Sequence, residues 1–323
     1  PSATRNTSRR PLPRWRRDVF RVADGSVVPP TLNPSPQGGG ESPRGKVGTS
    51  PGANSLPPGG GGIGRGGTTT SIIGEVALFA DTFNAYFEPE NLRAAVEVLT
   101  RLGYHVSVLA APGESRPLCC GRTFLSAGLV DQARAEARRV LAAAMPLVEK
   151  GGFIVGLEPS CLLSLRDEFR SMLPGADAER LAAQALMLEE FLAREAKAGR
   201  IPQAIGRYEG KVLLHGHCHQ KAFGIMAEIQ NALRLVQGLS VETVESSCCG
   251  MAGAFGYGAD TYEASMAMGE LSLLPAARKA AADTVIAADG FSCRHQIHDG
   301  TGRAALHVAR ILRDAMRSDG AKR

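Results

Sequence analysis

The sequence has no long apolar run and few aromatic residues. No stretch approaches the roughly 18 consecutive apolar residues that a membrane-spanning helix needs. No secretory signal is visible, because the first residues lack an apolar core. Aromatic residues make up 5%, whereas a hydrophobic content of 44% supports a sizeable core in 323 residues. We therefore expect a cytoplasmic protein with room for two domains of ordinary size.

The sequence also lacks an initiator Met, and its basic charge is confined to one end. Because it opens with Pro1, we expect a fragment or a processed product. Residues 1–70 carry ten Lys or Arg against three Asp or Glu, whereas residues 71–323 carry 27 against 29. The nearly neutral remainder gives no sign of a nucleic-acid surface.

The N-terminal segment has little apolar side-chain surface to bury. Residues 29–67 contain 21 Pro or Gly in 39 positions. Such a segment cannot offset the entropy that is lost when a chain becomes ordered. We therefore expect residues 1–71 to be a disordered segment and residues 1–70 to be dispensable for folding.

Cysteines are few, but six of the seven form two copies of one pattern. The doublets Cys119-Cys120-Gly121 and Cys248-Cys249-Gly250 lie 129 residues apart, and the single cysteines that follow them, Cys161 and Cys293, lie 132 residues apart. The seventh, Cys218, precedes the second doublet. Seven cysteines in a chain of this length do not form a secreted disulfide scaffold. Soft thiolates in glycine-marked turns suit an iron–sulfur cluster or zinc.

Predicted strands alternate with predicted helices in both copies. In the first copy we expect strands over 76–80, 105–109 and 153–157, and helices over 90–102, 129–149 and 177–198. In the second copy we expect strands over 212–215, 241–245 and 284–288, and helices over 223–236, 264–279 and 304–316. This order predicts an α/β fold of two tandem pseudo-repeated units with mainly parallel sheets, in domains at residues 72–200 and 201–323. Every cysteine then follows a strand, at the sheet edge where such folds bind ligands.

The second copy offers four thiols from three loops, namely Cys218, Cys248, Cys249 and Cys293. Four thiolates suit a zinc or iron–sulfur site. The separations of 29 and 43 intervening residues are far longer than the short hooks of small zinc modules. Because free cysteines are often buried, a purely structural role is the alternative.

The first copy offers only three thiols, namely Cys119, Cys120 and Cys161. Thr82 stands where the second copy has Cys218, so a fourth thiol is missing. Glu158, three residues before Cys161, is a candidate to supply an oxygen in its place. The alternative is a degenerate copy that is kept for packing.

Histidines and cations surround the predicted thiol site. His215, His217 and His219 alternate, which on a strand would place them on one face and Cys218 on the other. They are candidates for metal binding or proton transfer, and local hydrogen bonding is the alternative. Three cations lie within three residues of a cysteine, namely Arg122, Lys221 and Arg294. They would stabilise a negatively charged cluster, unless they are simply solvated at the surface.

These motifs resemble a known family. Two Cys-Cys-Gly motifs, followed by Glu158-Pro159-Ser160-Cys161 and by Phe291-Ser292-Cys293-Arg294-His295-Gln296, resemble the cysteine-rich "CCG" domain pair. That pair occurs in iron–sulfur subunits of glycolate oxidase, anaerobic glycerol-3-phosphate dehydrogenase and heterodisulfide reductase. The segments 79–83, 215–221 and 248–253 look most like the C-terminal part of FAD-linked oxidases of D-2-hydroxy acids, such as D-lactate or D-2-hydroxyglutarate. The resemblance covers about residues 72–318.

The resemblance implies an iron–sulfur electron-transfer module that passes electrons from reduced FAD to an acceptor. It implies a cluster of 4Fe–4S type and makes all seven cysteines candidate metal ligands. The chain has no C-x₂-C-x₂-C-x₃-C-P run and no flavin-binding portion. FAD therefore belongs to the missing or partner portion, and we expect the isolated chain to be inactive alone. No catalytic residue is assigned.

The resemblance also implies partners. They are the FAD-binding and ferredoxin-like portions of the same enzyme or complex. A peripheral membrane or quinone-linked acceptor, and with it a position at the inner face of the membrane, is left open. The alternative function is a structural or partner-binding module with zinc or no metal.

Overall fold

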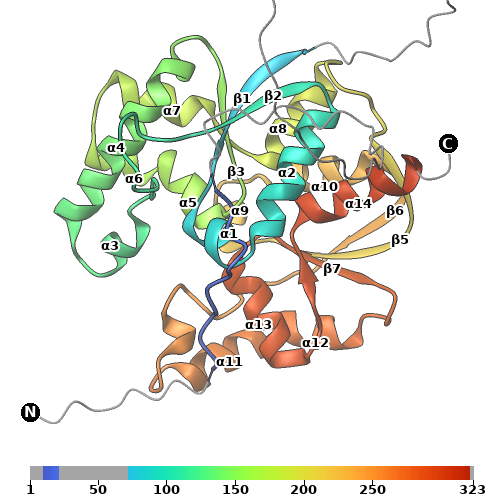
Figure 1. Cartoon of the computed structure of the whole chain (residues 1–323). Coiled ribbons are helices and arrows are strands. Elements are labelled where there is room, and N and C mark those ends of the chain that lie inside the picture. Colours follow the sequence, from blue (N-terminus) through green and yellow to red (C-terminus); the bar gives the residue numbers. More distant parts are fainter. Residues whose placement is uncertain (1–9, 22–71, 321–323) are drawn as a thin grey trace, which may run out of the picture. The chain divides into compact units, whose positions relative to one another are not determined.

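The computed structural model describes residues 10–21 and 72–320, which contain two parallel four-stranded sheets (Figure 1). The first sheet contains β1 (Gly74–Phe79), β2 (Tyr104–Val108), β3 (Phe153–Gly156) and β4 (Ala185–Met187), in the order β2-β1-β3-β4. The second contains β5 (Gly206–His215), β6 (Val236–Thr243), β7 (Val285–Ala288) and β8 (Ala305–Leu306), in the order β6-β5-β7-β8. The predicted α/β fold with parallel sheets is confirmed.

Helices follow the strands in both copies. The first copy contains α1 (Thr82–Tyr86), α2 (Pro89–Arg101), α3 (Arg122–Ser126), α4 (Val130–Val148), α5 (Pro159–Leu162), α6 (Glu168–Met172), α7 (Ala176–Gln184) and α8 (Leu188–Lys197). The second contains α9 (Cys218–Ala222), α10 (Met226–Arg234), α11 (Tyr262–Glu270), α12 (Leu273–Lys279), α13 (Phe291–Thr301) and α14 (Val308–Gly320). Within the described residues, no helix is both long enough and apolar enough to cross a membrane.

The central strands of the two sheets pair in the same register. Val76 of β1 lies beside Phe153 of β3, and Val212 of β5 lies beside Val285 of β7. The last four residues of both β1 and β5 are buried, as expected for parallel strands that are covered on both faces. The two copies therefore bring corresponding residues to the same edge of each sheet.

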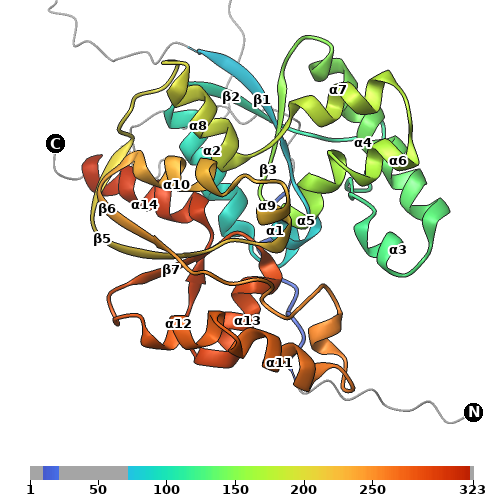
Figure 2. The same cartoon turned by 180° about the vertical axis from the view of Figure 1, so that it is seen from behind.

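One apolar core joins the two copies. It contains residues of β1, β2, β3 and β5 together with residues of α2, α8, α10 and α14. Helices α2 and α14 lie side by side, as do α8 and α10 (Figures 1 and 2). The buried apolar residues of α2 recur with helical spacing, at Leu92, Ala95, Val98 and Leu99. Both sheets accordingly belong to one compact unit.

The structure corrects several predicted elements. The helix expected over 177–198 is divided by β4, which adds a fourth strand to the first sheet. The helix expected over 264–279 is two helices, α11 and α12. The helix expected from residue 304 starts at Val308 and follows β8. These strands have three and two residues, so no periodic pattern marks them in the sequence.

Residues 10–21 pack against both copies and lie outside the strands and helices. This segment runs from the vicinity of α11 to α1 and is blue in Figure 1. Its N-terminal end is fixed by Arg10, whose side chain is 1% exposed and donates to Gly256 O at 2.8 Å and to Asp299 Oδ2 at 3.0 Å. Further on, the backbone N–H of Arg16 donates to Tyr86 O, and that of Phe20 donates to Ala85 O.

These contacts revise the expected boundary at residue 72. Residues 10–21 pack on the folded unit and so belong to it, whereas the expectation that residues 1–70 are dispensable for folding stays a prediction. The remaining residues of the predicted disordered segment, 1–9 and 22–71, lie outside the described residues. The sequence did not reveal this packing, because Arg10, which anchors the segment, cannot be distinguished by sequence from solvated arginines nearby.

Replacing the anchoring arginine tests this packing. We expect Arg10→Ala to lower the free energy of unfolding by about 2 kcal/mol, because the buried Gly256 carbonyl oxygen and the partly buried Asp299 carboxylate lose their donor. Chemical denaturation monitored by circular dichroism measures the change. The control is Arg14→Ala in the same segment, where the side chain is exposed and the change should stay within about 0.5 kcal/mol. Equal effects of the two variants would contradict the anchoring role of Arg10.

Candidate metal centre

The four thiols of the second copy meet at the carboxyl edge of its sheet. Cys218 is the first residue of α9, which follows β5, and Cys293 is the third residue of α13, which follows β7. Cys248 and Cys249 lie in the loop that follows β6. Because neighbouring parallel strands end at the same edge, residues that are far apart in sequence converge there.

The thiols form an interacting series from Cys218 through Cys248 and Cys249 to Cys293. Cys218 is exposed and Cys293 is 1% exposed, so the series runs from the surface into the core. The pKa of Cys248 is lowered to about 2, because the Cys218 thiol and then the Cys249 thiol donate hydrogen bonds to it. The pKa of the donor Cys249 is raised accordingly. The four thiols thus share protons that a soft cation would displace.

Steric and electrostatic constraints explain why the third residue of the Cys-Cys-Gly motif is glycine. Gly250 has φ of 96°, and a Cβ atom at this position would lie 2.1 Å from Ser265 O. Its backbone N–H points at the Cys248 sulfur, at 3.3 Å. In the first copy, Gly121 has φ of 77° and its N–H lies 3.4 Å from the Cys119 sulfur. The glycine therefore turns the chain so that an N–H group faces the first sulfur of each doublet.

The histidines do not alternate on a strand, as the sequence analysis expected. Only His215 belongs to β5, while His217 caps α9 and His219 lies within that helix. The Nδ1 atom of His217 accepts from His219 N at 3.1 Å and lies 3.7 Å from the Cys218 sulfur. The chain turns into a helix at this point, so Cys218 does not point away from the histidines.

His215 is buried against the inner thiols. One of its ring nitrogens lies within 4.8 Å of the Cys249 and Cys293 sulfurs, and its Nδ1 atom is paired with Ser246 Oγ at 2.9 Å. The pKa of Cys293 lies well below its ordinary value, mainly because Cys249 donates to it, with a smaller contribution from His215. His215 is therefore an additional candidate ligand.

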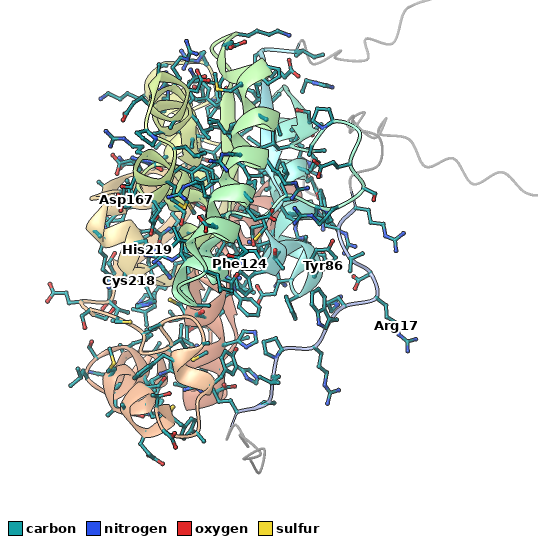
Figure 3. All side chains as sticks on the ribbon, turned by 90° about the vertical axis from the view of Figure 1, so that its left-hand side faces the viewer. Arg17, Tyr86, Phe124, Asp167, Cys218 and His219 are labelled. Carbon is teal, nitrogen blue, oxygen red and sulfur yellow. The ribbon has the colours of Figure 1, made fainter. Side chains whose placement is uncertain are left out.

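The three cations near the cysteines have different partners. Lys221 donates to the carbonyl oxygens of Ser246 and Ser247, directly before the doublet. Its pKa is lowered by burial, although the thiols favour its charged form. Arg122 pairs with Glu168 and with His219. His219 lies beside Cys218, as Figure 3 shows. Lys221 therefore lies where its charge acts on all four second-copy thiols.

The buried cation Arg294 joins the copies instead. Its guanidinium pairs with Glu88 of the first copy and donates to the carbonyl oxygens of Ala288 and Asp289. Its side chain is 5% exposed, so it is not a solvated surface group. The position next to Cys293 therefore reflects packing between the copies.

The first copy brings its three cysteines together without a fourth thiol. Cys120 interacts with Cys119 and with Cys161. Hydrogen bonding with Cys120 lowers the pKa of Cys161, but burial raises it to about 11. Thr82 is the first residue of α1, as Cys218 is the first residue of α9, so the expected substitution lies at the corresponding place.

Glu158, the expected source of a fourth ligand, has other partners. Its Oε2 atom accepts from Phe291 N at 2.8 Å, and its Oε1 atom accepts from Ser160 Oγ at 2.8 Å. Burial, and then the charge of Asp81, raise the pKa of Glu158 to about 8. The carboxyl group therefore caps α13 of the second copy, which the sequence analysis missed. The sequence repeat offers one signal for this cap. Glu158 directly precedes α5 and Gly290 directly precedes α13, the helices that carry the single cysteines of the two copies.

Comparison with known proteins agrees with this geometry. Residues 212–298 match the family model of the cysteine-rich "CCG" domain. This part of the second copy is thus similar to CCG domains. Its matched range runs from within β5 into α13 and contains all four converging thiols.

Curated proteins similar to the chain include a dehydrogenase subunit, a dehydrogenase and a lactate utilization protein. The chain is 28% identical over 244 residues to a subunit of anaerobic glycerol-3-phosphate dehydrogenase from Escherichia coli K12, which covers 75% of the chain and 59% of that protein. It is 28% identical over 239 residues to D-2-hydroxyglutarate dehydrogenase from Pseudomonas putida, covering 73% of the chain and 22% of that protein. Lactate utilization protein A from Bacillus velezensis is 26% identical over 189 residues, covering 56% of the chain and 74% of that protein. The chain thus spans about three-fifths of the first relative and about a fifth of the second.

The unequal thiol sets predict unequal metal binding. We expect Cys249→Ser to remove most of the bound iron, because it breaks the middle of a four-thiol series. We expect Cys120→Ser to remove less, because Thr82 stands in place of a fourth thiol in its copy. Iron analysis of anaerobically prepared variants measures both losses. Equal losses would argue against the asymmetry.

Proposed function

We propose that the chain is an iron–sulfur electron-transfer module of a flavin-dependent 2-hydroxy-acid oxidoreductase or a related dehydrogenase. The observation that carries the proposal is the interacting series of four thiols at the carboxyl edge of a CCG domain. The first two relatives named above are a dehydrogenase and a dehydrogenase component, which supports an oxidoreductase role.

The residues that surround the series fit an iron–sulfur cluster. Four thiolates are the usual ligand set of such clusters, and the proposed ligands are Cys218, Cys248, Cys249 and Cys293. We propose a cluster of 4Fe–4S type, and a second, weaker site at Cys119, Cys120 and Cys161. When bound, a cluster supplies one-electron redox chemistry that amino-acid side chains lack.

The chain's own groups tune and position such a site. The N–H of Gly250 faces the Cys248 sulfur, and Lys221 lies beside the doublet. Hydrogen bonds to sulfur and nearby cations stabilise added negative charge, which makes reduction easier. Cys218 reaches the surface and Cys293 is buried, so the site is open to a partner from one side.

Partners and domain limits follow from this role. We propose FAD-binding and ferredoxin-like portions as the electron donors, because residues 1–323 contain no motif for either. We propose residues 72–200 and 201–323 as the two cysteine-rich domains. All seven cysteines are free of disulfide bonds, which supports a reducing, cytoplasmic location.

A zinc-binding structural module is the second candidate, because nitrogen and sulfur donors also suit zinc. The group of His217, Cys218 and His219, whose ligand atoms lie within 4.8 Å of one another, favours it. Iron, sulfide and zinc analysis of anaerobically purified protein separates the two. Iron and sulfide in the amounts of one cluster per chain support the electron-transfer module. Stoichiometric zinc without sulfide supports the structural module.

Electron transfer itself is tested with a flavoprotein. We expect the isolated chain to oxidise neither D-lactate nor D-2-hydroxyglutarate with a dye acceptor, because it lacks a group that accepts a hydride. Mixed anaerobically with the reduced FAD-containing half of D-2-hydroxyglutarate dehydrogenase, the iron-loaded chain should lose visible absorbance, whereas the Cys249→Ser variant should not. Hydroxy-acid turnover by the isolated chain without added flavin would refute the proposal.

A further inference from the structure

A group of ionisable side chains away from the thiols lies where the two copies meet. Glu189 belongs to α8 of the first copy, whereas Asp289 follows β7 and His307 precedes α14 in the second copy. One ligand atom from each residue lies within 4.8 Å of the others. The exposed fractions are 0% for Glu189, 1% for Asp289 and 0% for His307. Water therefore does not screen the charges in this group.

The hydrogen bonds of His307 fix its charge. Its Nε2 atom lies 3.0 Å from Leu157 O, an acceptor, so Nε2 carries a proton. Its Nδ1 atom accepts from Ala309 N at 3.0 Å, so Nδ1 carries none. Burial lowers the pKa of His307, in agreement with a neutral ring. The ring is therefore neutral in this arrangement, and its Nδ1 atom lies 3.6 Å from Asp289 Oδ1.

Asp289 is hydrogen-bonded through both of its oxygens. Its Oδ1 atom accepts from Val308 N at 3.1 Å, and its Oδ2 atom accepts from Gln220 Nε2 at 2.8 Å. These bonds hold the carboxyl group in place. The nearby cation Arg294 is bound to Glu88 and to backbone carbonyls, so most of its donors are already used.

Glu189 has no such bonds. Among the residues that the structure describes, neither of its carboxyl oxygens has a hydrogen-bond partner. The next residue, Glu190, is paired with Arg166 and accepts from Met187 N. An ionised carboxylate that is buried without a partner costs several kcal/mol or more, so such a group is neutralised instead.

We propose that Glu189 holds a proton, and that Glu189, Asp289 and His307 form a buried site joining the two copies in which this proton keeps one carboxyl group neutral. A metal ion fits less well. The Nδ1 atom of His307 and both oxygens of Asp289 already accept N–H groups, which leaves Glu189 as the one residue with free oxygens. Divalent ions need at least three or four donors. The proposal is independent of the function proposed for the thiols.

Loss of this proton would place two carboxylates in a dry interface. The charged and titratable groups that face Glu189 or its partners include Asp289, His307, Glu190, Arg294, Glu88 and His217. Asp289 also binds Gln220, whose Oε1 atom accepts from His217 N next to Cys218. Repulsion between the carboxylates therefore acts on the packing of α8 and, through Gln220, on the start of α9, which carries Cys218.

The pH dependence has a definite sign. Burial, and then the charge of Asp289, raise the pKa of Glu189 well above its ordinary value of 4.5. The folded state therefore binds a proton that the unfolded state releases above pH 4.5. Stability from this site is complete below that pH and is lost as the pH rises toward the raised pKa. In that range the unfolding equilibrium constant rises about tenfold for each pH unit, so the protein becomes less stable.

Glu189→Gln tests the proposal in the full-length chain under reducing conditions. The amide keeps the shape of the carboxyl group but does not titrate. Between pH 4.5 and the raised pKa of Glu189, the unfolding equilibrium constant of wild type should rise about tenfold for each pH unit relative to that of the variant. The variant therefore becomes more stable than wild type by a growing margin as the pH rises. The control is Glu179→Gln, which removes an exposed carboxylate of α7 and should leave the pH dependence as in wild type. The same pH dependence in wild type and Glu189→Gln would overturn the proposal.

Two further measurements do not depend on unfolding. Infrared difference spectra of wild type against Glu189→Gln at neutral pH should contain the carbonyl band of a protonated carboxylic acid. A carboxylate band in its place would overturn the proposal. Metal analysis after treatment with a chelator should give the same divalent-metal content for both proteins. A stoichiometric metal ion that Glu189→Gln loses would show that the site binds a cation and not a proton.

Discussion

The hydrogen bond from Phe291 N to the buried carboxyl of Glu158 holds the two copies together at the edge where their cysteines lie. It caps α13, which has glycine at its own cap position and therefore no side chain to accept this N–H. The preceding residue, Leu157, accepts from His307 of the second copy. One turn of the first copy therefore supports the start of α13 and, through His307, the start of α14. The position of Cys293 depends on this contact, because the cysteine lies in the first turn of α13.

The two copies use corresponding positions for different purposes. Where the second copy has His217 and Cys218 at the start of α9, the first copy has Asp81 and Thr82 at the start of α1. Asp81 is 1% exposed and its carboxylate caps its own helix through Asn84 N. The first copy thus has polar groups that fix local structure where the second copy has thiol and imidazole groups that suit a metal. This division explains how a repeat can lose a ligand without losing its place in the fold.

The sequence was sufficient for the parts of the fold that repeat a local pattern. Alternating strands and helices predicted the parallel sheets, and the position of the cysteines after strands predicted that four thiols converge. The parts that it could not predict depend on contacts between distant residues, namely the short strands β4 and β8, the caps supplied by Glu158 and His307, and the anchoring of Arg10. The three histidines near Cys218 were misplaced because their alternation imitates a strand, whereas the chain enters a helix there. The metal-binding role of the cysteines stays a prediction.

Asp289 links the interface of the two copies to the thiol site. It accepts from Val308 N at the start of α14 and from Gln220, which in turn binds the backbone beside Cys218. The two bonds together hold its carboxyl group in one place. A second ionised carboxylate in the same dry space would repel Asp289 and so oppose these two bonds. The neutrality of Glu189 is therefore a condition for the geometry around Cys218, although Glu189 itself lies in the other copy.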